Sequence, residues 1–125
     1  GGELSGIACP DNIAIDRKGN LWITSDMSED KIGKDPYKKF GNNALFYVPT
    51  KGTHAGEAFK VAQAPIDAEL TGPCFSPDGK TLFLSVQHPG GSSKYIDKLT
   101  SHWPEGGNNI PKPSVVAIKI PSELI

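Results

Sequence analysis

The sequence has few cysteines, little excess charge and no long apolar run, and each shortage argues against a class of protein. Two cysteines, Cys9 and Cys74, are too few for a disulfide-rich scaffold, and we expect both to be buried free thiols. The 13 basic and 14 acidic side chains give a net charge of −1, which argues against nucleic acid or an anionic membrane as a partner. No apolar run approaches the ~20 residues that span a bilayer, and no secretory signal opens the chain.

Glycine and proline, by contrast, are plentiful, with 14 and 11 copies in a chain of 125 residues. They separate short segments in which apolar and polar residues alternate, which is the pattern of β-strands. No segment has the periodicity of an amphipathic helix. The expected strands are residues 12–16, 21–26, 42–50, 57–65, 73–76, 81–87 and 113–120.

The strand pattern repeats within the chain. Placing Gly19 on Gly79 aligns IAIDRKGN-LWIT with PCFSPDGKTLFLS, with Thr81 inserted. A repeated unit of four antiparallel strands is typical of a β-propeller, although an antiparallel sandwich is an alternative. We therefore expect an all-β fold of about two four-stranded antiparallel blades, one from residues 1–67 and a nearly complete one from 68–125.

Two blades cannot close a propeller ring, which contains ~4–8 of them. The first and last blades would each expose an apolar face, because a repeat buries its core only against its neighbours. The chain is then a piece of a longer protein, or several copies assemble. Self-association through open blade edges is a further expectation.

Polar side chains gather where the hairpins begin and end. A first strand enters and a second strand leaves a hairpin at the same end, which places Asp11, Asn12, Asp26, Glu69 and His88 together. Carboxylate and amide oxygens suit a hard cation such as calcium. For Asp11 and Asn12, ordinary turn chemistry is an equally good interpretation, and His88 is either a structural hydrogen-bonding residue or a substrate contact.

Two long insertions follow the second strand of each unit, at residues 27–42 and 90–113. Loops of this length in a compact domain are functional or disordered. The first carries four lysines that could meet an anion, and solvated loops are the alternative. These lysines are Lys31, Lys34, Lys38 and Lys39.

Five segments in this order resemble the C-terminal part of PhoX-type alkaline phosphatases. The more specific ones are ELTGPCFSPDGKTLFLSVQHPG and, after it, SHWPEGG. The others are PDNIAIDRKGNLWITSD, GNNALFYVP and PKPSVVAIKI, so that the resemblance covers most of the chain.

The resemblance implies a secreted or periplasmic bacterial phosphomonoesterase, exported by the twin-arginine route, with calcium and iron in the channel of a propeller. Glu69 matches an acidic residue that we expect to bind calcium, Asp11 and Asn12 match a second blade start, and His88 is a possible phosphate contact. The iron-binding cysteine belongs to a part of the family that these residues lack. Many relatives have an arginine shortly before this acid, where this chain has Pro65, Ile66 and Asp67.

On this interpretation the substrate is a small phosphate ester, and the 125 residues alone are inactive. Two other functions fit the same pattern. A calcium-dependent lactonase-like propeller would need no iron and would hydrolyse lactones. A non-catalytic propeller would serve as a binding scaffold, and its partner binding would not change in a Glu69→Gln variant.

Overall fold

The computed structural model describes residues 6–124, which form strands and two short 3-10 helices. Within this range there is no α-helix, and no helix is long and apolar enough to cross a membrane. Every expected strand is present, but one begins at Glu69 instead of Pro73. The elements are β1 (Pro10–Ile15), β2 (Leu21–Ser25), η1 (Lys38–Phe40), β3 (Ala44–Val48), β4 (Phe59–Gln63), β5 (Glu69–Phe75), β6 (Thr81–Gln87), β7 (Ser114–Lys119) and η2 (Ser122–Leu124).

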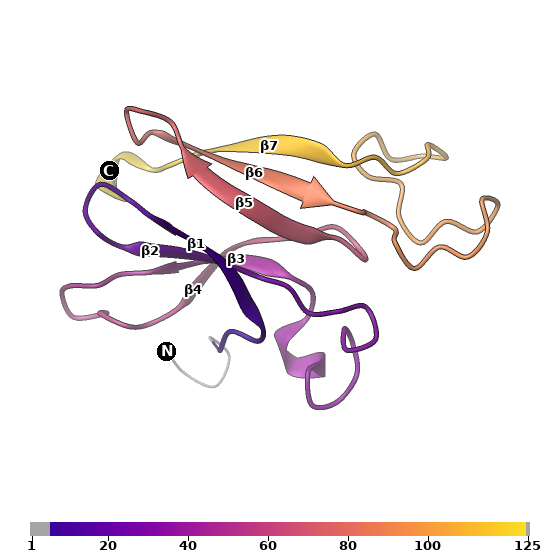
Figure 1. The fold of residues 1–125 in the computed structure, drawn as a ribbon, viewed down its shortest axis with the longest axis horizontal. Coiled ribbons are helices and arrows are strands. Elements are labelled where there is room, and N and C mark those ends of the chain that lie inside the picture. Colours follow the sequence, from indigo (N-terminus) through magenta and orange to yellow (C-terminus); the bar gives the residue numbers. More distant parts are fainter. Residues whose placement is uncertain (1–5, 125) are drawn as a thin grey trace.

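The strands form two antiparallel sheets, which appear as two layers in Figure 1. One sheet has the order β1-β2-β3-β4, and the other has the order β5-β6-β7. This all-β fold of one four-stranded and one three-stranded open sheet confirms the predicted fold class and is consistent with partial propeller blades. The division into blades at residues 67 and 68 stays a prediction.

A single carboxylate organises the turn between β1 and β2. Asp16 Oδ1 accepts hydrogen bonds from the backbone N–H groups of Lys18 and Asn20, both at 2.9 Å. Asp16 Oδ2 accepts one at 3.1 Å from the indole N–H of Trp22. Burial raises the pKa of Asp16, but the hydrogen bonds outweigh it and the pKa is lowered. The turn therefore fixes both the register of the hairpin and the direction of the Trp22 ring.

The internal repeat is visible in the strand pairing. Ile15 pairs with Leu21 beside the first turn, and Phe75 pairs with Leu82 beside the second. Upstream of these pairs, both first strands contain a register shift of the β-bulge type. Bulges increase the local twist and bend a strand. The two hairpins are therefore structural equivalents, as the sequence predicted.

The main core lies between the two sheets. The Trp22 ring is tilted against Tyr47 at a centroid distance of 5.1 Å and meets Phe75 edge-on at 5.7 Å. Such aromatic pairs add about 0.5–1.5 kcal/mol beyond the burial of their surface. Aliphatic side chains from both sheets complete the cluster, among them Leu45, Leu70, Leu82, Leu84 and Val86.

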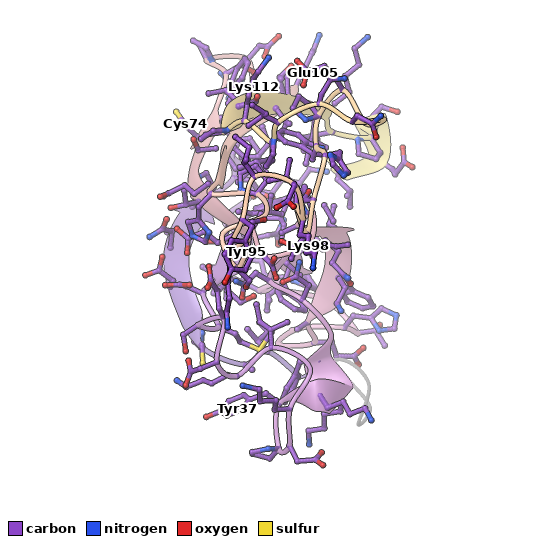
Figure 2. All side chains as sticks on the ribbon, turned by 90° about the vertical axis from the view of Figure 1, so that its right-hand side faces the viewer. Tyr37, Cys74, Tyr95, Lys98, Glu105 and Lys112 are labelled. Atoms are coloured by element: carbon purple, nitrogen blue, oxygen red, sulfur yellow. The ribbon has the colours of Figure 1, made fainter. Side chains whose placement is uncertain are left out.

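The expectation of two buried thiols is only half right. Both cysteines are free, but Cys9 is half-buried and Cys74 is exposed. The Cys74 side chain projects from the surface in Figure 2. The reason is its position in β5, where alternate residues face away from the neighbouring sheet.

Candidate functional site

β5 begins and β6 ends at one end of the molecule, on the right in Figure 1, where both long loops also lie. Figure 2 looks at this end and labels Tyr37 in the first loop and Tyr95 and Lys98 in the second. A cleft of about 460 Å³ opens here. Its polar lining includes Asp26, Glu29, Asp30, Asn43, Asp67 and His88.

Two of the predicted carboxylates are in contact at this end. Asp26 follows β2, Glu69 opens β5, and their side chains are hydrogen-bonded to each other. Two carboxyl groups can share such a bond only when one of them carries a proton. Glu69 is 9% exposed, whereas Asp26 lies open to the cleft. The structure thus joins two acids that are far apart in the sequence, Asp26 and Glu69, which we call the acid pair.

The surroundings of Glu69 raise its pKa to about 7. Burial is the largest cause, followed by the hydrogen bond to Asp26 and the negative charge of Asp26. The charge of Asp11 adds to this effect, whereas His88 lowers the pKa. Like charges that converge in this way are stabilised by protons or by a cation. The charges of Asp11, Asp26 and His88 therefore all act on Glu69.

Asn12, by contrast, uses its side chain to join the two sheets. Its Oδ1 accepts a hydrogen bond of 2.5 Å from Thr71 Oγ1 and one of 2.9 Å from the Gly72 backbone N–H. The Asn12 backbone N–H donates to Thr24 Oγ1 at 3.3 Å. An ion bound by this amide oxygen would compete with two donors from β5. The role of Asn12 as a metal ligand stays a prediction.

Asn43 is a residue of this site that no sequence pattern indicated. Its side chain is 1% exposed, and its Oδ1 accepts a 2.6 Å hydrogen bond from the Met27 backbone N–H. Its Nδ2 donates to the carbonyls of Met27 at 3.1 Å and Ala68 at 3.4 Å. Met27 and Ala68 are the neighbours of Asp26 and Glu69 in the sequence. Asn43 therefore holds the two segments that carry the acid pair.

Backbone strain is concentrated at the same end. Among residues 6–124, the non-glycine residues with positive φ are Cys9 at 50°, Asp67 at 60° and His88 at 37°. Such conformations cost roughly 1–3 kcal/mol each and often mark functional sites. The Asp67 carbonyl accepts a hydrogen bond from His88 Nδ1 at 3.0 Å, so that this nitrogen carries the hydrogen. The Asp67 carboxylate also accepts a hydrogen bond from Thr100 in the second loop.

The loop lysines do not line the cleft, whose described lining contains no lysine or arginine. Lys31 lies 5.4 Å above the centre of the Tyr37 ring, and Lys39 lies 5.1 Å above that of Phe40, both within their own loop. The only arginine of the chain, Arg17, donates to the Pro77 carbonyl and links the two turns at the opposite end. With four carboxylates and one histidine in its lining, the cleft repels an anion unless cations are added.

The acid pair supplies only part of the oxygen ligands that a hard cation needs. Asp26 and Glu69 offer four carboxylate oxygens, and calcium takes six to eight. Within residues 6–124, no group of three or more acidic, histidine or cysteine side chains is arranged to hold a metal ion. A metal bound here would therefore need further ligands. Asp11, whose negative charge also acts on Glu69, is one candidate.

The comparisons with known proteins agree with the sequence resemblance. A family model described as alkaline phosphatase PhoX matches residues 3–90, which is more than half of the chain. The structure is similar to a chain described as "Pseudomonas fluorescens PhoX in complex with vanadate, a transition state analogue", with a TM-score of 0.69 and 36% identity. The match covers 88% of this chain but only 17% of that one. No curated protein matches. The chain belongs to the PhoX alkaline phosphatase family.

Proposed function

We propose that this chain forms part of the active site of a metal-dependent phosphomonoesterase and contributes a calcium subsite. The observation that carries the proposal is the contact between Asp26 and Glu69, with the pKa of Glu69 raised to about 7. A perturbed acid beside a second carboxylate, in a cleft, is characteristic of functional sites. The family match supports phosphate-ester chemistry for the longer protein.

In this proposal the chain's own residues position a cation and then a substrate. Glu69 and Asp26 lose their shared proton and hold the ion, with Asp11 beside them. A bound cation supplies positive charge that neutralises phosphate oxygens and compensates for the acidic cleft. His88 lines the cleft and is the proposed contact for a phosphate group. Asn43 keeps the carboxylates in register and acts as a positioning residue.

The substrate class follows from the family and from the similar structure. That structure contains vanadate, which its description calls a transition state analogue. A small phosphate monoester is therefore the proposed substrate of the longer protein. Iron is also proposed there, with ligands largely outside these residues, and export from the cytoplasm is proposed from the family resemblance. Since the chain corresponds to 17% of the similar structure, we expect the isolated 125 residues to be inactive.

The test uses the full-length protein that contains this segment. Glu69→Gln should remove bound calcium, measured by elemental analysis, and lower the turnover of p-nitrophenyl phosphate by 100-fold or more, on the order expected when a metal-ligand contact is lost. Glu105→Gln, an exposed glutamate on the second loop, is the matched control and should change neither.

Three results would contradict the proposal. Full calcium content and normal turnover in Glu69→Gln would remove Glu69 from the site. Hydrolysis of lactones but not of phosphate esters by the unaltered protein would favour the lactonase alternative. Neither activity nor metal in the full-length protein would favour a binding scaffold.

A further inference from the structure

The second loop, residues 90–113, is attached to the cleft by a short chain of side-chain hydrogen bonds. Thr100 Oγ1 donates to Asp67 Oδ2, and Asp67 lies just before β5 and lines the cleft. The Thr100 backbone N–H donates to Ser93 Oγ at 3.0 Å, and the two hydroxyl oxygens are 3.1 Å apart. A hydroxyl has one hydrogen, and that of Thr100 goes to the carboxylate, so Ser93 is the donor between the hydroxyls. The donors thus run from Ser93 through Thr100 to Asp67.

Asp67 connects this chain of hydrogen bonds to His88. Its backbone carbonyl accepts the 3.0 Å hydrogen bond from His88 Nδ1. Since Nδ1 is occupied, a ligand in the cleft would meet Nε2, which accepts a hydrogen bond when the ring is neutral and donates one when it is protonated. His88 is exposed where it lines the cleft, so packing alone does not fix its ring. The hydrogen bond to Asp67 therefore determines which ring nitrogen a ligand meets.

Both residues of this hydrogen bond have a strained backbone. The φ angle is 60° at Asp67 and 37° at His88. Such conformations persist only where several surrounding contacts hold them. The turn around Asp67 is closed by a 3.1 Å hydrogen bond from the Ala68 N–H to the Pro65 carbonyl. The hydroxyl of Thr100 adds a contact that holds the Asp67 side chain.

We propose that Asp67 and Thr100 are positioning residues, which hold the His88 ring with its hydrogen on Nδ1 and present Nε2 to ligands in the cleft. The second loop thereby controls this histidine. The proposal concerns contacts within the described residues and does not depend on what surrounds them in a longer protein. Only its effect on activity rests on the proposed function, in which His88 contacts a phosphate group.

NMR of the full-length protein that contains this segment, deuterated and labelled with ¹⁵N-histidine, measures the ring tautomer. The signals of His88 are assigned by their loss in His88→Gln, in alkaline buffer, where ¹⁵N shifts distinguish the two neutral tautomers. The unaltered protein should carry the His88 hydrogen on Nδ1. Thr100→Val keeps the shape of the side chain but lacks the hydroxyl, and it should shift the ring toward the Nε2–H form that free histidine prefers. Thr100→Ser should keep the Nδ1–H form.

Asp67→Gly and Asp67→Asn form a second pair of variants, in which Thr100 itself is unchanged. Glycine accepts the positive φ but lacks the acceptor, whereas asparagine tolerates this conformation and keeps an acceptor oxygen. Asp67→Gly should therefore resemble Thr100→Val, and Asp67→Asn should resemble the unaltered protein. Thr53→Val makes the same change at an exposed residue between β3 and β4 and should leave the His88 signals unchanged. Circular dichroism checks that each variant is folded.

Steady-state kinetics with p-nitrophenyl phosphate test whether the position of the ring matters for the reaction. His88→Ala should raise KM about 10-fold with a smaller change in kcat, on the order expected when a hydrogen bond to a charged group is lost. Thr100→Val should raise KM about 3-fold, since it loosens the ring without removing it. In the His88→Ala background, Thr100→Val should have no further effect, because it acts through His88.

An unchanged His88 tautomer in both Thr100→Val and Asp67→Gly would overturn the proposal. An effect of Thr100→Val on KM that is equally large with and without His88 would overturn it as well, because Thr100 would then act by another route. A shifted tautomer together with a normal KM in His88→Ala would support the positioning of the ring. That result would contradict instead the phosphate contact of the proposed function.

Discussion

The side chains of Asp26 and Glu69 repel each other when both are ionised. Their contact is favourable only when a proton or a cation lies between them. Burial disfavours the charged form of Glu69, and the neighbouring carboxylate disfavours it further. In the absence of a cation, a shared proton relieves the repulsion. A divalent cation would relieve it more strongly and would lower the pKa of Glu69. The stability of the metal-free protein should therefore depend on the protonation of this residue.

We expect the metal-free chain to lose stability as the pH rises from 5 to 8. The pKa of Glu69 is about 7 in the folded state and near 4.5 in the unfolded state, so that only the folded state keeps the proton between these values. The free energy of unfolding should fall by on the order of 1 kcal/mol, after allowance for solvent screening. Urea unfolding with a chelator at pH 5, 6, 7 and 8 measures it. Glu69→Gln should flatten this slope, and an unchanged slope would contradict the assignment to Glu69.

Asn43→Ala should destabilise the protein strongly. The change removes three hydrogen bonds of a buried amide and leaves groups of Met27 and Ala68 without them. Unsatisfied buried groups cost roughly 1–3 kcal/mol each, and we expect a total loss of about 2–4 kcal/mol. Urea unfolding at constant pH measures it. Asn108→Ala, an exposed change in the second loop, should stay within about 0.5 kcal/mol. Equal effects of the two variants would mean that Asn43 does not support the acid pair.

Among the elements, the two first strands act as one unit at the site. β1 and β5 each begin at this end, and Asn12 ties them together through Thr71 and Gly72. The bulges in both strands lie beside this link. Bulges often occur next to functional sites, where they redirect side chains. The distance between Asp11 and Glu69 therefore depends on a link between sheets.

Asn12→Ala should loosen this link, and Asn12→Asp should largely keep it. Alanine removes the acceptor from two donors of β5 and should cost about 1–3 kcal/mol. Aspartate keeps an acceptor oxygen in the same place, although it adds a negative charge beside Asp11. Chemical denaturation measures the stabilities, and hydrogen exchange of the Gly72 amide measures the link itself. Unchanged exchange at Gly72 in Asn12→Ala would show that this hydrogen bond does not hold the strands.

The strands could be predicted from the sequence because alternation and turn residues are local signals. The start of β5 was placed too late because Gly72 and Pro73 suggest a strand boundary, whereas the structure continues the strand through them with a bulge. The exposure of Cys74 could not be predicted, since alternation does not tell which face of a sheet meets a neighbour.

The candidate site was predictable only in part, because contacts between segments far apart in the sequence leave no local signal. The hairpin geometry brought Asp26 and Glu69 to one end, and the structure places them in contact. Asn43 was missed because its neighbour Asn42 and the preceding glycine resemble a turn, and its partners lie 16 and 25 positions away. For the lysines of the first loop the sequence left two alternatives, contact with an anion or plain solvation, and in the structure two of these lysines lie on aromatic rings of their own loop.

For the whole molecule, the acidic lining of the cleft determines which ligands can enter it. The cleft end contains carboxylates without a lining lysine or arginine, while Arg17 links the turns at the opposite end. A phosphate ester would therefore reach this cleft only with the help of cations. The chain corresponds to 17% of the similar PhoX structure, so that most of a complete metal centre would lie in other parts of a longer protein. Even without those other parts, the proposed calcium subsite in this chain should still bind calcium, although weakly.

The side-chain carboxyl signals of Glu69 and Asp26, followed by ¹³C NMR during a calcium titration at pH 7, test this subsite most directly. We predict saturable shifts at these two carboxyl groups, smaller ones at Asp11, and a pKa of Glu69 that falls below 7 when calcium is bound. Glu69→Gln should abolish the shift at Asp26. Equal, unsaturated shifts at all carboxylates of the chain, or no change at Glu69, would contradict the proposal that this acid pair holds a cation.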